Sequence, residues 1–239
     1  MNMERVSSRV LWATLAGGLL ACCQVAPTLA GWEVVYETDF STDPGWMTNN
    51  SANYYWEPST GTFFSRQIDG LPDEYAYIQL PLLQAGYRWR VEYDVYPISY
   101  TWAGDARLGL MDPGMDIACG TSQHLHLDFP LVDQGHTTYL AYQDSKGVAS
   151  RHFGFFTPGT WYSAVMEWDP QGGTLYANVR ERDSGNLVAD TMFSGLAGFS
   201  GIDRLAMSTV CDHYAPGATG EARTVVMPAR RRIPFRRGE

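Results

Sequence analysis

The sequence predicts an all-β protein built from two stacked antiparallel sheets. Apolar and β-prone residues alternate with polar residues at period two over most of the chain, a pattern typical of strands with one buried face. Short clusters of Gly, Asp, Asn and Ser separate these runs, as turns between antiparallel neighbours do. About a dozen short strands in one domain favour two packed sheets over one open sheet.

The N-terminal segment, residues 1–30, is predicted to be a secretory signal peptide. Two arginines precede an apolar run, Val10–Cys23, and the small-residue stretch "APTLA" ends at Ala30. This is the order of regions in a signal peptide, and the apolar run is shorter than the ~20 residues that a membrane span needs. We therefore expect a secreted or periplasmic protein without a membrane span. The alternative is a lipoprotein anchored through Cys22 in "LLAC".

The first expected strand covers residues 31–40. Residues 54–66 are predicted to form a hairpin that turns at Pro58–Gly61, because Pro and Gly there interrupt the alternation. The same period-two pattern between turn residues predicts the strands that follow, which lie in residues 74–80, 86–99, 105–112, 122–129, 137–144 and 148–156.

Residues 160–193 give the clearest pattern, that of a three-strand meander. The first strand alternates two sets of side chains, and the sequences "DPQGG" and "DSGN" then supply the two turns. Residues 202–210 add a late strand. A single β-sandwich domain is therefore expected over residues 31–227, with no repeat or low-complexity linker dividing it.

The C-terminal residues 228–239 differ from the rest of the chain, because five of these twelve residues are arginine. We interpret them as a disordered basic tail rather than a binding arm. The whole chain has a formal net charge of −9, and the body without the tail and signal is more acidic still. An acidic body argues against nucleic acid as the partner and fits neutral glycans or cations better.

Two of the four cysteines lie in the predicted signal, which leaves Cys119 and Cys211. In an oxidising compartment this pair can form one disulfide between two loops, and two unpaired thiols are the alternative. The spacing does not match a zinc site.

Three stretches of the sequence resemble the concanavalin A-like lectin/glucanase superfamily, and more narrowly the laminin-G-like domains of secreted bacterial proteins. They are "TDFSTDPGW", "RVEYDV", and "TWYSAVMEWDPQGGTLYANVRERDSGNLV" followed by "IDRLAMSTV". The resemblance spans residues 31–226. It implies a jelly roll of two curved antiparallel sheets, with any ligand site on the concave face or its rim loops. It does not assign a reaction.

The C-terminus departs from that family. Such domains end on a strand resembling "IDNV" that pairs beside the first strand, whereas "EARTVVM" at 221–227 stands there and lacks the acidic residue. A cation site inherited through that strand is therefore not expected. The abrupt change of composition also suggests a hypothesis, namely that the last ~20 residues are a diverged or frame-shifted end.

The segment "HLHLDF" supplies the candidate ligand-binding residues. On a strand, His124, His126 and Asp128 share one face and the intervening apolar residues the other. With Arg107 and Tyr142 on neighbouring strands, this polar face could line a cleft, since imidazole, carboxylate and guanidinium groups all hydrogen-bond sugar hydroxyls. The alternatives are an ordinary solvated strand face, and metal or lyase chemistry at the same residues.

Aromatic residues supply a second set of predictions. Tyr100 and Trp102, in the loop "YTWAGD", are predicted to form a rim platform for a sugar ring. Aromatic residues at alternating strand positions are predicted to lie in the core; they are Trp89, Tyr93, Trp161 and Trp168. Trp46 and Trp56 are predicted to seal the edge of the sandwich.

A catalytic carboxylate pair is less well supported. The resemblance implies glutamates flanking an aspartate on one strand face, and the nearest match is Glu92 with Asp94 in "EYDVYP", where the second glutamate is absent. An exposed face of paired charges, with Arg88 and Arg90, explains this pattern better. The polysaccharide lyases of the superfamily use His, Tyr and Arg instead, which would suit the residues near His126.

Calcium is a possible ligand at Asp39 and Asp43 in "DFSTD", because hard oxygen ligands from a turn suit that ion. The spacing lacks that of an EF-hand loop, and side chains that cap a turn explain it better. No other cofactor is predicted.

These observations favour an exported carbohydrate-binding or adhesion-type module without catalytic activity. A polysaccharide-degrading enzyme, a lyase rather than a hydrolase, is the first alternative, and a structural envelope protein without a small ligand is the second. The sequence does not specify the glycan or the oligomeric state.

Overall fold

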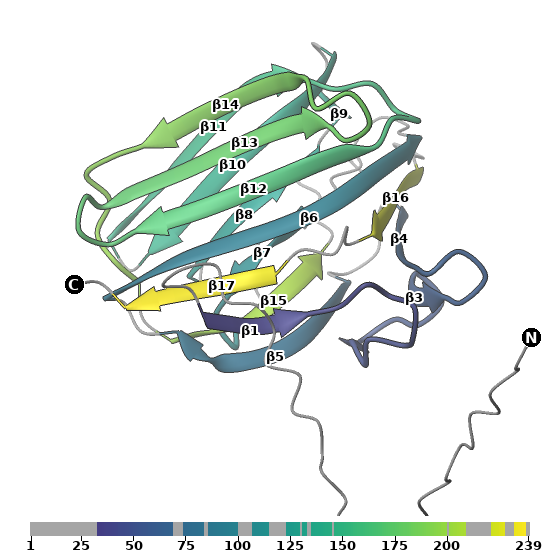
Figure 1. Ribbon diagram of the computed structural model, residues 1–239, viewed down its shortest axis with the longest axis horizontal. Coiled ribbons are helices and arrows are strands. Elements are labelled where there is room, and N and C mark those ends of the chain that lie inside the picture. Colours follow the sequence, from purple (N-terminus) through teal and green to yellow (C-terminus); the bar gives the residue numbers. More distant parts are fainter. Residues whose placement is uncertain are drawn as a thin grey trace, which may run out of the picture.

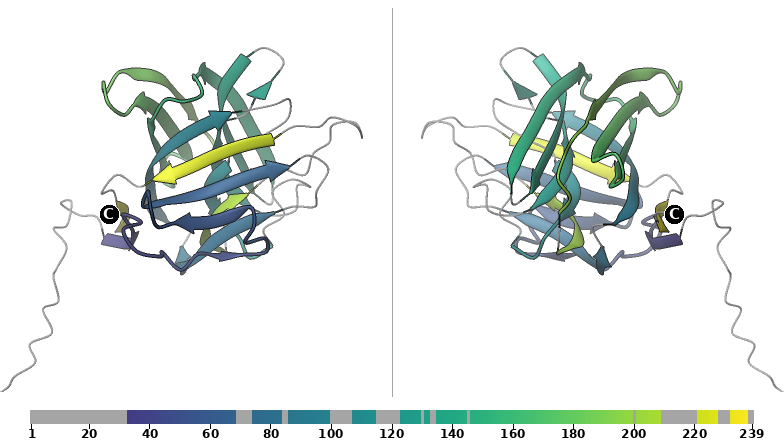
Figure 2. Two further views of the ribbon diagram at one scale, coloured as in Figure 1. Left: turned by 90° about the vertical axis from the view of Figure 1, so that its right-hand side faces the viewer. Right: turned by 90° about the vertical axis from the view of Figure 1, so that its left-hand side faces the viewer.

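The computed structural model describes most of the chain after the predicted signal. The described residues are 33–68, 74–83, 86–99, 107–114, 123–129, 131–132, 135–144, 146–199, 201–208, 221–227 and 232–237. Every described element is a strand, and the strands form two antiparallel sheets stacked face to face, with β13, β12 and β6 in front of β10, β8 and β7 (Figure 1). Turned views show the two layers from the sides (Figure 2). The predicted signal, Tyr100, Trp102, Cys119 and Cys211 lie outside the described residues.

The nine-stranded sheet has the order β14-β13-β12-β6-β16-β4-β3, and β17 pairs with both β6 and β1. The bounds are β14 Leu187–Phe193, β13 Thr174–Glu181, β12 Tyr162–Asp169, β6 Tyr87–Ser99, β16 Glu221–Met227, β4 Thr62–Ile68, β3 Tyr54–Glu57, β17 Arg232–Arg237 and β1 Glu33–Glu37. The meander predicted in residues 160–193 is confirmed as β12, β13 and β14.

The eight-stranded sheet has the order β11-β10-β8-β7-β15-β5-β2, and β9 pairs with β10. Its bounds are β11 Gly147–Phe155, β10 Gly135–Asp144, β8 His124–Asp128, β7 Arg107–Met111, β15 Ile202–Ser208, β5 Tyr75–Leu83, β2 Met47–Thr48 and β9 Leu131–Val132. All of the strands predicted between residues 74 and 156 are found within a few residues of their expected positions.

The hydrophobic core fills the space between the two sheets. Alternate residues of β6 point into it, and Tyr142 of the opposite sheet stacks on Trp168 with ring centroids 5.7 Å apart. Phe199 closes the same region, because its ring lies 4.7 Å from that of Trp89. Trp89, Tyr93 and Trp168 are core residues, as predicted. Trp161 is an exception, because it packs on the outer face.

Trp161 lies on the outside of the nine-stranded sheet. Its ring lies 5.0 Å from that of Tyr96, and the guanidinium carbon of Arg182 lies 4.4 Å from its ring centroid. Alternation explains this placement, since Trp161 shares a face with Ser163 and Glu167 and not with buried Tyr162.

The stretch from Thr38 to Trp56 seals one edge of the sandwich. Trp46 donates a hydrogen bond of 2.6 Å to the Tyr36 hydroxyl, and Trp56 donates one of 2.8 Å to the Phe40 carbonyl oxygen. Phe40 is buried and has a positive φ of 51°, which a non-glycine residue adopts only under local constraint. The prediction that the two tryptophans act as edge plugs agrees with this packing.

The C-terminal segment corrects the prediction of a disordered tail. Residues 232–237 form β17, which pairs with β1 from Glu33 to Glu37 and with the start of β6 (Figure 1, yellow beside purple). The residues "EARTVVM" form β16 in the same sheet, between β4 and β6. The strand beside the first strand is therefore "RIPFRR". The Arg-rich composition led to the prediction of disorder, although the backbone of this segment pairs with two strands of the sheet.

The described part of the chain holds no helix that is long and apolar enough to cross a membrane.

Candidate functional site

Strand β8 carries polar residues on the outer face of the eight-stranded sheet. Leu125 and Leu127 point into the core, so His124, His126 and Asp128 point away from it. The shared face was predicted. However, the three polar side chains are at most 3% exposed, which rules out an ordinary solvated strand face. Polar groups that are buried on the outside of a sheet need a specific explanation.

The strand pairing aligns four of the polar and aromatic residues in one row. Arg107 on β7 is the register partner of Asp128, Asp128 is the partner of Tyr139 on β10, and Tyr139 is the partner of His152 on β11. Direct register partners on one face of an antiparallel pair have side chains within contact distance. The row therefore crosses four strands at right angles.

Asp128 connects the row to His126. Arg107 Nε donates a hydrogen bond of 2.8 Å to Asp128 Oδ2, and His126 Nε2 lies 3.3 Å from the same oxygen. The rings of His126 and His124 lie 4.7 Å apart, centroid to centroid, and those of His126 and Tyr139 lie 6.4 Å apart. One guanidinium, one carboxylate, two imidazoles and one phenol ring thus gather at the centre of this face.

The electrostatics of the centre follow from burial. Burial raises the pKa of Asp128 to about 7, against the opposing effects of the charge and the hydrogen bond of Arg107. Burial also lowers the pKa of His126 well below its usual value, and the charge of Arg107 lowers it further. The His126 imidazole is therefore neutral near pH 7, and its 3.3 Å approach to Asp128 is a contact of a neutral ring rather than an ion pair.

The ring nitrogens of His126 have no hydrogen-bond partner in the described part of the chain. Asp128 Oδ1 lacks one there as well. A buried polar atom without a partner costs roughly 1–3 kcal/mol. Such atoms are unusual in a native structure and are a reason to look for a ligand.

The row opens to solvent at its β11 end. His152 is exposed and Tyr139 is intermediate, whereas Asp128 is fully buried. The Tyr139 and His152 rings lie 4.7 Å apart, and the Thr137 hydroxyl lies 2.8 Å from His152 Nδ1. The site therefore grades from a buried polar centre to an accessible aromatic end.

Gly109 makes the central arrangement possible. It is the register partner of His126, and a Cβ built on Gly109 would lie 2.5 Å from the His126 Cβ and 2.2 Å from the Leu125 carbonyl oxygen. Only glycine can therefore occupy this position while β7 and β8 keep their present distance.

The prediction that Tyr142 belongs to this face is wrong. Tyr142 is the register partner of Leu125, and its ring lies in the core, 2% exposed. Its hydroxyl donates a hydrogen bond of 3.0 Å to Asp144 Oδ2. Burial raises the pKa of Tyr142, and the Asp144 carboxylate raises it further.

Tyr139, His152 and Gly109 were not identified from the sequence. The alternation in "TTYLAYQD" puts Leu140 and Tyr142 on one face of the strand and Tyr139 on the other. The correct face of each tyrosine was therefore available from the pattern. What the pattern did not give was the register between β10 and β8, which sets Tyr139 beside Asp128.

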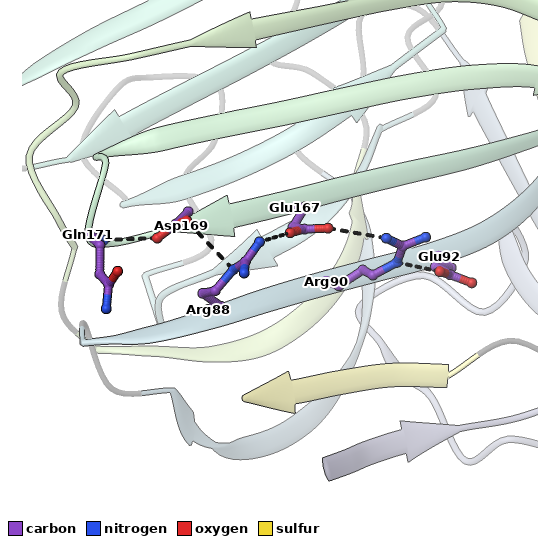
Figure 3. A network of polar contacts seen from close by, with 6 residues as sticks. All are labelled: Arg88, Arg90, Glu92, Glu167, Asp169 and Gln171. Carbon is purple, nitrogen blue, oxygen red and sulfur yellow. Dashed lines mark hydrogen bonds and ion pairs between the residues drawn. The ribbon is translucent and has the colours of Figure 1, made fainter. Parts of the chain in front are cut away.

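The predicted exposed face of paired charges includes Glu92 but not Asp94. Glu92 accepts a hydrogen bond from Arg90, which belongs to a ladder of paired charges on the outer face of the nine-stranded sheet (Figure 3). The other ladder contacts are Arg90 Nη1 to Glu167 Oε2 at 3.1 Å, Arg88 Nη2 to Glu167 Oε1 at 2.5 Å, and Arg88 Nε to Asp169 Oδ2 at 3.7 Å. Asp94 is fully buried and accepts a 2.6 Å hydrogen bond from Ser163 Oγ.

Asp39 and Asp43 cap turns. Asp39 Oδ1 accepts hydrogen bonds from the amide and hydroxyl of Ser41, at 2.9 and 2.6 Å, and Asp43 Oδ1 accepts one of 2.8 Å from the Gly45 amide. These contacts agree with the alternative to a calcium site, in which the two aspartates cap turns. In the part of the chain that the structure describes, no group of three or more His, Cys, Asp or Glu side chains is arranged to hold a metal ion.

Comparison with known proteins identifies the fold. Peanut lectin, in a structure with a nine-residue peptide, matches with a TM-score of 0.54 and 10% identity, over 82% of this chain and 99% of that one. A β-glucanase of Bacillus licheniformis matches with a TM-score of 0.53 and 10% identity, over 83% and 99%. The CBM2 module of the evolved Dit of Lactobacillus casei BL23 phage J-1 matches with a TM-score of 0.52 and 12% identity, over 84% of this chain and 97% of that one.

The chain therefore has the concanavalin A-like jelly-roll fold that the sequence predicted. No family model and no curated protein sequence matches it. The laminin-G-like part of the prediction stays a prediction.

Proposed function

We propose that this protein, which has the concanavalin A-like fold, binds carbohydrate through the outer face of its eight-stranded sheet. The residues that we assign to binding are Arg107, His126, Asp128, Tyr139 and His152. Similarity to a lectin and a β-glucanase supports the fold only. The proposal for this chain depends on its own residues.

The observation that carries the proposal is the unpartnered imidazole of His126. Within the residues that the structure describes, both ring nitrogens are buried without a hydrogen-bond partner, beside Asp128 Oδ1, which also lacks one. A sugar hydroxyl is both donor and acceptor, so neighbouring hydroxyls could satisfy the neutral imidazole and the carboxyl group together. The Tyr139 and His152 rings at the open end could pack against the C–H face of the same sugar.

A binding measurement on the mature protein tests this proposal. A glycan array would identify the ligand, and calorimetry would measure its affinity for wild type and for the His126→Leu and Arg107→Gln variants. We expect each variant to lose about tenfold or more, as for a lost hydrogen bond to a charged or buried group. The matched control is Arg90→Gln on the opposite sheet, which should bind like wild type. Full binding by His126→Leu would contradict the proposed site.

A polysaccharide lyase is the second candidate function. Arg107, neutral His126 and Tyr139 share one face, and the ring centroids of His126 and Tyr139 lie 6.4 Å apart. In a uronate chain, the imidazole could accept the proton next to the carboxylate while Arg107 neutralises that carboxylate. A C=C bond then forms as the bond to the leaving oxygen breaks, and the leaving oxygen takes up the Tyr139 proton.

An ultraviolet assay for the unsaturated product separates these functions. Turnover that is lost in His126→Leu supports the lyase, and binding without turnover supports the module. The absence of both binding and turnover would favour a structural envelope protein without a small ligand.

We also propose that the mature chain is exported after removal of residues 1–30. The basic, apolar and small-residue order of that segment supports this proposal. Mass spectrometry of the secreted protein tests it, with an N-terminus at Gly31 as the expected result. A lipid-modified Cys22 would instead support the anchored alternative.

A further inference from the structure

Strand β11 carries a β-bulge beside the accessible end of the proposed site. Its pairing with β10 skips Phe153, which lies between His152 and Gly154. Phe153 packs against the core, and a Cβ built on Gly154 would lie 2.2 Å from the Cβ of Ala189 on β14, in the opposite sheet. Two successive residues of β11 therefore face inward, as expected where a bulge adds one residue to a strand.

The bulge puts Phe155 on the outer face of the eight-stranded sheet. Side chains three residues apart on a regular strand point to opposite faces, but the extra residue gives His152 and Phe155 the same face. The register agrees, because Phe155 pairs with Thr137, which lies two residues before Tyr139 on β10. The Thr137 hydroxyl in turn lies 2.8 Å from His152 Nδ1. Phe155 is therefore a neighbour of the proposed site on the same surface.

The Phe155 side chain is accessible to a ligand. It is 69% exposed, and β10 is the strand that pairs with β11 in the described part of the chain, so Phe155 lies at the edge of the sheet. An isolated exposed apolar side chain needs no explanation. Phe155, however, adjoins the rings of Tyr139 and His152, which lie 4.7 Å apart and are intermediate and exposed, respectively. These three residues form an accessible aromatic surface, which we call the edge platform.

We propose that Phe155 binds a second sugar unit of the glycan, so that the ligand is an oligosaccharide whose chain leaves the site over the edge of β11. This inference rests on the proposed carbohydrate-binding function, which assigns the first unit to His126, Tyr139 and His152. The exposed Phe155 ring offers the next unit an apolar surface on which a C–H face packs. Covering that ring removes apolar area from water, which favours binding.

The register sets where the second unit lies. Phe155 and Thr137 form the row next to that of His152 and Tyr139, and such rows on one face of a sheet are ~7 Å apart along the strand. A sugar ring that packs on Tyr139 and His152 therefore leaves the Phe155 ring uncovered, and the next unit of the chain covers it. The contribution of Phe155 to the affinity should begin with the disaccharide.

Binding measurements on Phe155→Ala test this inference. The probes are the xylo-, cello-, laminari-, galacturono- and alginate oligosaccharides, each from the monosaccharide upward, and NMR titration of the mature protein also measures the weak affinities of the shortest members. For the series that binds, we expect Phe155→Ala to lower the affinity for the disaccharide and longer chains about fivefold to tenfold, as for a lost stacking contact. The affinity for the monosaccharide should stay the same.

Two further variants serve as controls. Phe155→Trp keeps an aromatic ring and should keep the affinity for every length. Val148→Ala removes another exposed apolar side chain of β11, 67% exposed and near the other end of the strand, and should bind like wild type.

The possible results distinguish this inference from the proposed function. An equal loss for the monosaccharide and the longer chains, or no loss at any length, would overturn the role of Phe155 and leave the proposed function standing. No binding of any probe by wild type would overturn both.

Discussion

Arg107 Nε and Asp128 Oδ2 are joined by a 2.8 Å hydrogen bond between direct register partners on β7 and β8. Arg107 is only 10% exposed at its side chain and Asp128 is fully buried. This pair carries both a charge and a titratable proton into the proposed binding face, and the pH dependence of stability follows from it.

Asp128 should make the protein less stable as the pH rises. Its folded pKa is about 7, against ~3.9 in the unfolded chain, so its contribution is fully present below about pH 4 and lost as the pH rises through 7. We expect the free energy of unfolding of wild type, relative to Asp128→Asn, to fall by at most ~1.4 kcal/mol per pH unit in that window. Urea unfolding between pH 4 and 8 measures this difference, and parallel curves for the two proteins would contradict it. The comparison cancels the opposite effect of His126, whose lowered pKa removes stability at acid pH.

Gly109→Ala should strongly destabilise the protein. The new Cβ would lie 2.2 Å from the Leu125 carbonyl oxygen, so β7 and β8 would have to move apart, at a cost of about 3 kcal/mol or more. The control is Gly147→Ala on β11, because a Cβ there meets nothing within 4 Å. Chemical denaturation compares the two variants, and equal stability would show that the close approach does not matter.

His126→Leu should separate binding from stability. The leucine removes two buried nitrogens that have no partner among the described residues and keeps a similar volume, so the free energy of unfolding should stay the same or rise by ~1 kcal/mol. Binding should be lost at the same time, which is typical of residues selected for function. Thermal unfolding and calorimetry of one preparation measure both. A large loss of stability would instead indicate a structural role for the imidazole.

Glu167→Gln should lower the free energy of unfolding only slightly. The side chains of Arg90 and Glu167 are 33% and 19% exposed, and partly solvated pairs contribute about 1 kcal/mol or less. Salt should reduce even this difference. Unfolding at low and high ionic strength tests the expectation, and a salt-independent loss of several kcal/mol would assign the ladder in Figure 3 a larger role.

Removal of residues 228–239 should destabilise the sandwich. The truncation removes β17, so the backbone of β1 loses its partner and the start of β6 loses a neighbour. Hydrogen exchange should then speed up for amides in 33–37 and 87–89, while β12 and β13 stay protected. Truncation of residues 238–239 alone is the control. Unchanged protection of β1 would restore the prediction of a disordered tail.

Local pattern predicted most of the fold. The expected strand at 86–99 corresponds to β6, Tyr87–Ser99, because alternation along a strand is a local property that does not depend on the strand's neighbours. The split of β8 into polar and apolar faces was predicted for the same reason.

Properties that depend on distant residues could not be predicted. Tyr139 was missed because its position beside Asp128 depends on the β10–β8 register, whereas the face of Tyr142, which it shares with Leu140, was available from the alternation. The burial of Asp128, and hence its raised pKa, depends on neighbours from several strands. Strand β17 was missed because its partner, β1, lies at the other end of the chain.

The pairing of Glu33 with Phe235 also bears on how the protein folds. Contacts between residues this far apart close late and slowly, because a long loop must be ordered before they form. Until residues 232–237 have been synthesised, β1 and the start of β6 expose backbone edges that β17 would pair with, and such edges are sites of aggregation. A nascent chain therefore cannot complete its larger sheet before β17 has left the ribosome.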